Sequence, residues 1–189
     1  MAYYALLASL PMLTCEGNAG ITPDYFLSCC SAFVDGDKFR ILEILTLDPE
    51  PECFPESSFA QRFSLWECAL RNAIVHVRSE KWNRDPSDYI KKEIESEADS
   101  DRLAATALSI KNPLERERYL DQVRWEKIEE MEFGGQFTFD QLCAYKLKLL
   151  IQQKWIRREQ SNAAGNLELA VESVCRQTER IAIQEENKI

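Results

Sequence analysis

The sequence has few of the residues that build tight turns and only one residue of the type most used for acid–base catalysis. Its 189 residues include six glycines, seven prolines and a single histidine, His76. So few turn residues argue against an all-β fold, which needs a turn after each short strand. His76 has no partner at a fixed spacing, so a structural or surface histidine is favoured over a catalytic base. The patterns GxxxxGK[ST] and GxGxxG are absent, which excludes nucleotide sites of those types.

The seven cysteines have no regular spacing and form no CxxC pair. A secreted disulfide framework would have an even number at recurring spacings, so reduced thiols in a cytoplasmic protein are the simpler interpretation. The adjacent Cys29 and Cys30 are expected to be small helix residues rather than a redox pair. The acidic segment 91–101 lacks the glycine and final glutamate of a calcium loop. We therefore expect no metal and no cofactor.

The chain also has fewer basic than acidic residues and no long apolar run. The net charge is −9 and the pI is about 4.8, and such a surface repels phosphate backbones and anionic lipid headgroups. The apolar start MAYYALLASLPML lacks the basic residues of a signal peptide and is too short to span a bilayer. The sequence therefore predicts no nucleic-acid partner and no direct membrane insertion.

What is present is the composition of a helical protein. Hydrophobic residues make up 45% and charged residues 29% of the chain, which is ordinary for a globular domain. We predict an all-α fold of about eight helices, in one domain or in two closely packed helical lobes. The division would be an N-terminal helical lobe at 1–86, an acidic linker with a short helix at 87–111, and a C-terminal helical lobe at 112–189.

In the N-terminal part, start and stop signals set the expected helices. The segment 2–10 is helix or strand, because its period decides neither. Thr22 is an N-cap before Pro23, and the helix should run to about residue 34. Residues 35–37, Asp-Gly-Asp, should end this helix before a second short helix at 38–45. A long helix should then run from a cap at Ser57 or Ser58 to Trp82. Its apolar positions repeat at steps of four and three: Phe59, Phe63, Trp66, Leu70, Ala73 and Val77.

Further helices are expected at 102–109, from 113 to the Gly134–Gly135 turn, from 139 onward, and at about 167–183. Asn112 with Glu115, and Thr138 with Gln141, resemble capping boxes. The helix after Asn112 gathers apolar residues on one face, namely Leu114, Leu120, Trp125, Ile128 and Met131. The helix after Thr138 is apolar over well over half its circumference, which predicts a central position.

Asp121, Arg124 and Trp125 form the sharpest constellation, because Asp121 and Arg124 lie within an apolar helix face at a spacing that permits an ion pair. One interpretation is a polar contact site for a partner helix, since Arg and Trp are typical interface anchors. The other is an ion pair that holds two helices in register. The partner of Arg124 would be Asp121 or an acid on a neighbouring helix. Tyr145 and Trp155 are further structural or partner-contact candidates.

Three stretches, YYALLASLPML, NPLERERYLDQVRWEKIEE and FDQLCAYKLKLLIQQKW, resemble an uncharacterised bacterial family encoded beside the genes of V-type (A/V-type) ATP synthases. The shared motifs are Tyr3–Tyr4, Ala8–Ser9–Leu10–Pro11, Asn112–Pro113–Leu114–Glu115, Asp121, Arg124–Trp125, Phe139–Asp140, Ala144–Tyr145 and Trp155. That family in turn looks like a shortened relative of the C subunit of V-type ATPases, which is the d subunit in eukaryotes.

The resemblance implies a non-catalytic structural or coupling subunit of a V-type ATP synthase, a central-stalk or rotor adaptor. Its partners would be ATP synthase subunits, either the central shaft or the membrane-embedded part. It would be cytoplasmic and attached peripherally to the membrane through the complex. The alternative is a helical adaptor or assembly chaperone unrelated to the ATPase, and an enzyme is the third interpretation.

Overall fold

In the computed structural model, residues 3–18, 20–56, 58–90, 94, 98–135 and 137–161 are described, and all regular structure in these ranges is helical. This confirms the all-α prediction. The chain divides into two compact units, Met1–Gln152 and Gln153–Ile189. The first unit contains the whole segment 87–111 that the sequence suggested as a linker between two lobes, and that division into lobes stays a prediction.

Three short helices begin the first unit: α1 (Tyr4–Ser9), α2 (Pro23–Ser31) and α3 (Gly36–Ile44). Within the ambiguous segment 2–10, residues 4–9 are thus helical. The hydroxyl of Thr22 accepts a hydrogen bond from the Tyr25 amide at 3.1 Å, which confirms the predicted cap. The predicted break between the second and third helices is confirmed, because α2 ends at Ser31 and Asp35 is extended. Asp35 is the N-cap of α3, which therefore starts at Gly36, two residues before the predicted start.

The long helix α4 (Phe59–Trp82) follows the 3-10 turn η1 (Pro51–Cys53), and its two ends are as the sequence predicted. Ser58 caps the start by accepting from the Gln61 amide. At the other end Asn83 adopts a left-handed conformation with φ 48°. The amides of Asn83 and Arg84 bond back to the carbonyls of Glu80 and Ser79, a Schellman motif that ends the helix.

Next come η2 (Ser87–Tyr89), α5 (Ala98–Ser109), α6 (Pro113–Glu132) and a helix over residues 139–161. The structure starts α5 four residues before the predicted start at 102. Asn112 caps α6 through the Leu114 amide at 2.9 Å, and Gly134 takes a positive φ of 92° in the predicted turn. Gln141 does not bond to Thr138 as a capping box requires, because its side-chain oxygen accepts from the amide of Phe137.

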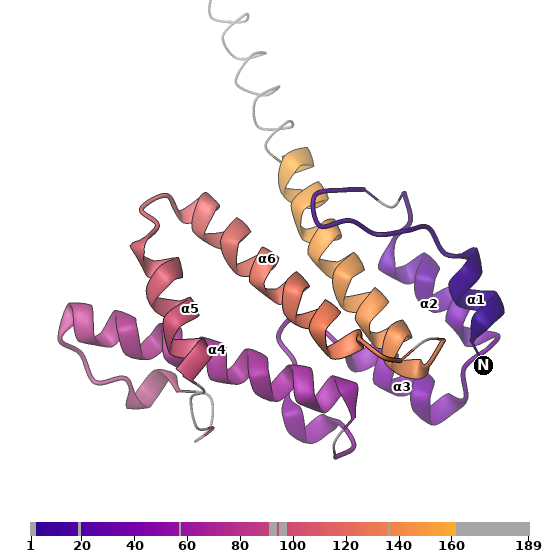
Figure 1. The fold of residues 1–189 in the computed structure, drawn as a ribbon, viewed down its shortest axis with the longest axis horizontal. Coiled ribbons are helices and arrows are strands. Elements are labelled where there is room, and N and C mark those ends of the chain that lie inside the picture. Colours follow the sequence, from indigo (N-terminus) through magenta and orange to yellow (C-terminus); the bar gives the residue numbers. More distant parts are fainter. Residues whose placement is uncertain are drawn as a thin grey trace, which may run out of the picture. The chain divides into compact units, whose positions relative to one another are not determined.

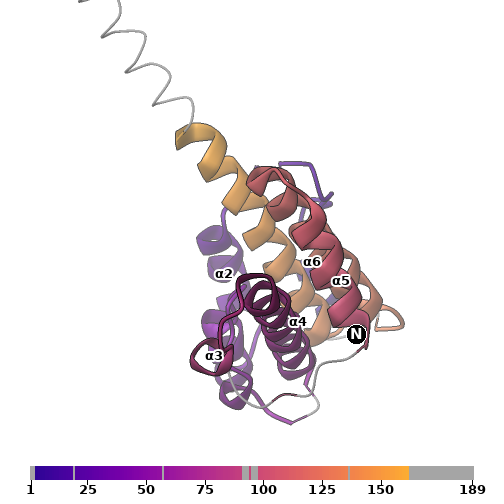
Figure 2. The same cartoon turned by 90° about the vertical axis from the view of Figure 1, so that its left-hand side faces the viewer.

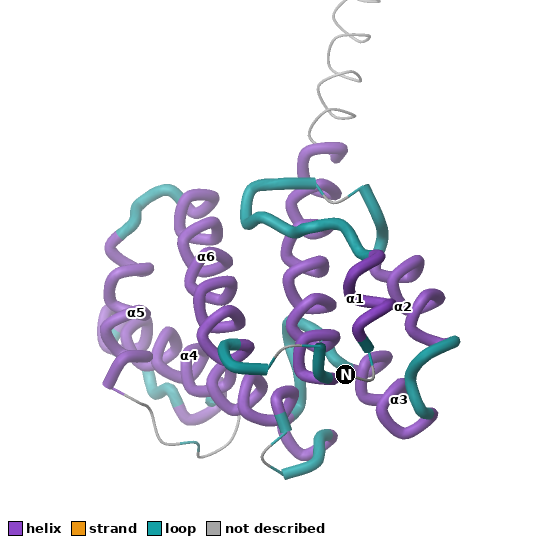
Figure 3. The backbone as a smooth tube through the Cα atoms, turned by 45° about the vertical axis from the view of Figure 1, so that its right-hand side comes forward, coloured by secondary structure: helices purple, strands orange, loops and turns teal. Residues whose placement is uncertain are grey.

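Within the first unit α4 packs against both α5 and α6. Figure 2 looks nearly along α4, with α5 and α6 together on one side and α3 on the other. Residues 139–152 lie beside α6, with α1, α2 and α3 on their far side (Figures 1 and 3). Lys148 joins these neighbours by pairing with Glu132 of α6 at 2.8 Å. The helix that was predicted to be central therefore has neighbours on two sides.

The core is apolar and forms along α4, α6 and residues 139–152. Five of the six predicted α4 positions are buried, and Val77 is half-buried. On the apolar face of α6, Leu120, Trp125 and Ile128 are buried, while Leu114 in the first turn is 39% exposed. The largest fully buried side chains include Phe26, Phe59, Phe63, Leu42, Leu45, Leu70, Ile128, Leu142, Leu147, Leu149 and Ile151.

The turn expected at 161–165 and the helix expected at 167–183 fall outside the described residues, apart from residue 161, which is helical. Within the described ranges, no helix combines the length and the apolar character needed to cross a membrane.

Candidate functional site

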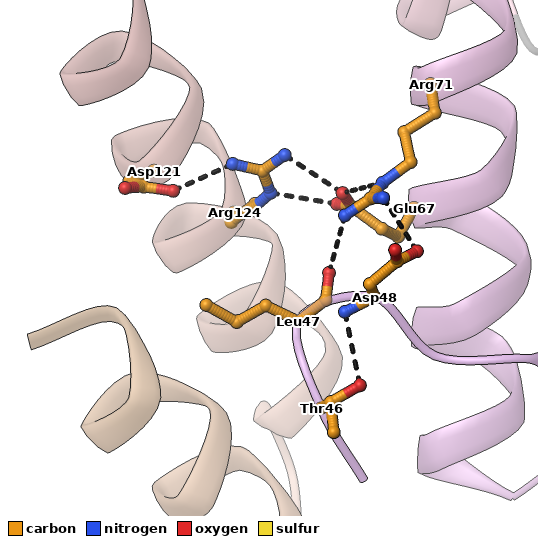
Figure 4. A network of polar contacts seen from close by, with 7 residues as sticks. All are labelled: Thr46, Leu47, Asp48, Glu67, Arg71, Asp121 and Arg124. Carbon is orange, nitrogen blue, oxygen red and sulfur yellow. Dashed lines mark hydrogen bonds and ion pairs between the residues drawn. The ribbon is translucent and has the colours of Figure 1, made fainter. Parts of the chain in front are cut away.

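A buried ion network joins α6 to α4 and contains two of the five residues singled out from the sequence (Figure 4). The guanidinium of Arg124 donates two parallel hydrogen bonds to Glu67 of α4, Nε to Oε2 at 3.0 Å and Nη2 to Oε1 at 2.9 Å. Its third nitrogen, Nη1, donates to Asp121 Oδ1 at 2.7 Å. The forked geometry matches the planar carboxylate, which is what makes arginine suited to such pairs.

The network continues from Glu67 to the loop that follows α3. Arg71, one turn further along α4, donates from Nε to Glu67 Oε1 at 2.7 Å. Its other nitrogens reach Asp48 at 2.6 Å and the carbonyl of Leu47 at 2.9 Å. Three carboxylates thus meet two guanidinium groups, and three separate segments of the chain are tied together.

The central members of the network are shielded from water. Glu67 is fully buried, Asp121 is 1% exposed and Arg124 is 7% exposed. Burial by itself lowers the pKa of Arg124, but the carboxylate of Glu67 and then that of Asp121 outweigh it and raise the pKa. The arginine therefore stays charged at every pH at which the fold is stable. A buried ion pair of this kind orients the two helices. If the arginine is lost, a carboxylate stays buried among apolar groups without its counter-charge.

These contacts favour the second interpretation of Asp121 and Arg124, an ion pair that holds two helices in register. The ion pair between them is confirmed, and an acid on a neighbouring helix, Glu67, completes it. Because the guanidinium is buried and turned towards α4, it is not a surface anchor for a partner helix. The polar contacts of Arg124 hold α4 and α6 in register.

Trp125 lies next to the network but makes separate contacts. It is 5% exposed, and its indole Nε1 donates to Glu129 Oε1 at 2.9 Å. The ammonium of Lys148 lies 5.5 Å from its ring centroid, within the range of a cation–π interaction. Trp125 therefore packs the junction between α6 and residues 139–152.

Tyr145 and Trp155 each make contacts of their own. The Tyr145 hydroxyl donates to the carbonyl of Pro11 at 2.9 Å, and its ring stacks on Phe26 at 5.2 Å. Trp155 belongs to the second unit, where the charges of Lys154 and Arg158 lie 5.8 and 5.2 Å from its ring centroid. Within the first unit, Asp121 and Arg124 thus share one network, while Trp125 and Tyr145 make separate contacts.

A second buried cation, Lys146, is not among the residues that the sequence singled out. It is 4% exposed and donates to the carbonyl oxygens of Leu42 and Glu43, the latter at 3.0 Å. These carbonyls belong to the last turn of α3, where a helix has unpaired acceptors and a partial negative charge. Burial lowers the pKa of Lys146 from its usual 10.5 to about 8.

Sequence signals for the missed residues existed. Glu67 stands between Trp66 and Cys68 in an otherwise apolar stretch, and Arg71 follows it at ion-pair spacing. Lys146 similarly interrupts the apolar run from Leu142 to Ile151. A charge inside an apolar helix face needs a partner, but the spacing does not reveal which element provides it.

The other candidates from the sequence have ordinary surroundings. His76 is exposed. The six cysteines among the described residues are free thiols, with Cys30 buried and Cys29 half-buried. Burial first, and then the neighbouring Cys29, raise the pKa of the Cys30 thiol to about 12, which makes it a poor nucleophile. In the described part of the chain no three His, Cys, Asp or Glu residues cluster in a way that would hold a metal ion.

Comparison with known protein families identifies a match in the C-terminal half of the chain. Residues 105–166 match a family described as a protein of unknown function (DUF2764). The matched segment covers less than half of the chain and runs from the end of α5 through α6 and the helix at 139–161. It includes Asp121, Arg124 and Lys146 but not Glu67. No curated protein and no solved structure matches the chain.

Proposed function

We propose that this protein is a non-catalytic structural or coupling subunit associated with a V-type ATP synthase. It would be a cytoplasmic protein held at the membrane by its partners, which are the central shaft or the membrane-embedded part of the complex. The proposal starts from the resemblance of three sequence stretches to a family encoded with such synthases. Its structural support comes from how those stretches meet.

The residues that carry the resemblance contact one another across the chain. The ring of Tyr3 lies 6.4 Å from that of Phe139. Tyr145 bonds to Pro11, and within α6 Arg124 pairs with Asp121 three residues before it. These contacts between residues of the shared motifs are the observation that carries the proposal. A relative with the same motifs would have the same contacts and therefore the same helical arrangement.

A subunit that works by coupling needs helices that keep their relative positions under load. The α4–α6 junction has this property, because a buried arginine pairs with carboxylates on both helices. Packed interiors deform little and transmit strain from one side to the other. The acids of the network are occupied by guanidinium groups, and this favours a mechanical role for them over a role in acid–base chemistry.

The test is purification of the tagged full-length protein from its native cells in mild detergent, followed by mass spectrometry. We expect ATP synthase subunits to be enriched over an untagged control strain. Recovery of no ATP synthase subunit, while the complex is intact in the same extract, would contradict the proposal. Reproducible enrichment of a different set of proteins would favour the alternative of a helical adaptor or assembly chaperone.

A further inference from the structure

Two adjoining cavities lie at the C-terminal end of α4 and share Arg78 and Trp82. The first, of about 250 Å³, is lined in addition by Val75, Ser79, Arg84 and Tyr89. The second, of about 320 Å³, extends to Lys81, Leu108 and Arg116. We call the two together the α4-end patch. It combines residues from α4, the segment that follows it, α5 and the first turn of α6.

The α4-end patch is basic in a protein that is strongly acidic. Arg78, Lys81, Arg84 and Arg116 line it, and no acidic side chain among the described residues does so. The whole chain carries −9. Arg116 is fixed in place because Nε and Nη2 both donate to the carbonyl of Ile110, at 3.2 and 2.7 Å. Acids do lie close in sequence, and Asp85 is occupied by hydrogen bonds from Ser87.

Cations near a helix C-terminus have a simpler use, which is to offset the helix dipole. That use explains Lys81 in the last turn of α4. It does not explain the two large aromatic side chains beside the cations, Trp82 at 62% and Tyr89 at 64% exposure. Arginine and exposed aromatic residues around a concavity are the features of binding hot spots.

We propose that the α4-end patch binds a short acidic segment of a partner protein that carries an aromatic or aliphatic anchor residue. The carboxylates would pair with the arginines and Lys81 at the rim. The anchor would enter the cavity and contact Trp82, Tyr89 and Leu108. The proposal does not depend on the partner being an ATP synthase subunit.

A peptide segment fits this patch better than a nucleic acid does. A nucleic-acid strand carries a charge at every phosphate and would extend beyond the four cations onto an acidic surface, which repels it. An acidic peptide can confine its charges to the patch. The apolar part of the cavities, Val75 and Leu108, also suits an aliphatic side chain, whereas a polyanion backbone gains nothing from it.

The test is calorimetric titration of the full-length chain with a short synthetic peptide of Glu and Asp that contains one Phe and one Leu. We expect binding that weakens as salt is added, because exposed charges are screened. Arg78→Glu and Trp82→Ala should each weaken binding roughly tenfold or more. Arg40→Glu is the matched control, since Arg40 is exposed on α3 and the charge change is equal. It should change affinity less than twofold.

Three further measurements decide the outcome. A peptide with Lys in place of Glu and Asp should not bind, and unchanged melting temperatures should show that the variants are folded. Absence of peptide binding at low salt, or equal weakening by Arg40→Glu and Arg78→Glu, would overturn the proposal. The proposal would also be overturned if a single-stranded oligonucleotide bound more tightly than the peptide and Arg78→Glu abolished that binding, because the site would then be one for nucleic acid.

Discussion

Arg124 and Lys146 are both buried cations, but different groups compensate the desolvation of their charges. Arg124, between α4 and α6, has carboxylate partners on both helices, and they raise its pKa. Lys146, between residues 139–152 and α3, donates its hydrogen bonds to backbone carbonyls, and burial lowers its pKa to about 8. Both side chains are less than a tenth exposed.

The difference shows that burial alone does not decide the pKa of a basic side chain. Two full negative charges compensate the desolvation of the guanidinium, while the partial charges of a helix terminus compensate that of the ammonium only in part. The α4–α6 junction should therefore be strong and insensitive to alkaline pH. The α3 junction should respond to pH within a range that experiments reach.

The largest effect is expected for Arg124→Ala. The change removes the shared partner of Glu67 and Asp121 and leaves Asp121 buried without its arginine. We expect the free energy of unfolding to fall by about 3 to 5 kcal/mol. For a chain of this size that is a drop in melting temperature on the order of 10 °C, measurable by circular dichroism.

A matched control is Arg71→Ala, which removes a more exposed member of the same network while leaving Arg124 on Glu67. We expect it to cost about 1 kcal/mol, in the range of solvent-accessible ion pairs. Equal melting temperatures for wild type and Arg124→Ala would place Arg124 outside the stabilising network. Replacing Glu67, Asp121 and Arg124 together by apolar residues should recover much of the loss, since no buried charge then lacks a partner.

The second prediction concerns the pH dependence that Lys146 provides. Between about pH 8 and 10.5 the unfolded chain keeps the Lys146 proton and the folded chain has released it. The unfolded state then binds more protons, so the contribution of Lys146 to stability rises with pH across this window. Below pH 8 both states are protonated, and the full cost of burying the charge is present. The shift corresponds to roughly 3 kcal/mol.

Lys146→Met and Lys146→Arg should both remove this rise, because neither side chain titrates in the window. The measurement is urea unfolding of the wild type and both variants below pH 8 and near pH 10.5. We expect the stability of each variant relative to the wild type to fall by up to about 3 kcal/mol between the two conditions. Parallel pH dependences for all three proteins would show that Lys146 keeps its ordinary pKa.

The smallest effect is expected at Tyr145, the neutral neighbour of Lys146. Tyr145→Phe removes the hydrogen bond to Pro11 but leaves the ring stacked on Phe26. We expect a loss of about 1 kcal/mol at about pH 7. Burial raises the pKa of Tyr145 to about 12, so at this pH the hydroxyl is protonated in both the folded and the unfolded state and the loss reports the hydrogen bond. Tyr25→Phe is the control. Tyr25 is 57% exposed, so this substitution should leave the melting temperature unchanged. A loss at Tyr145 equal to that at Arg124 would remove the distinction between neutral and charged contacts.

The features that sequence predicted well are those with local causes. Thr22, Ser58 and Asn112 cap their helices through amides two or three residues away, so the signal and its effect lie in the same short stretch. The break at Asp35 also has a local cause. An Asp-Gly-Asp stretch suits both the end of one helix and the start of the next, and the extended backbone of Asp35 makes it the N-cap of α3.

By itself the sequence determined that the chain is helical, where most helices begin and end, and which faces are apolar, because side-chain period and capping act within a few residues. It also identified Asp121 and Arg124 as charges that need partners. Only the tertiary structure decided who those partners are. Glu67 is 57 residues from Arg124, and Leu42 is 104 residues from Lys146. Whether a buried charge meets a carboxylate or a carbonyl depends on which segments the core brings together, and no spacing along the chain encodes that choice.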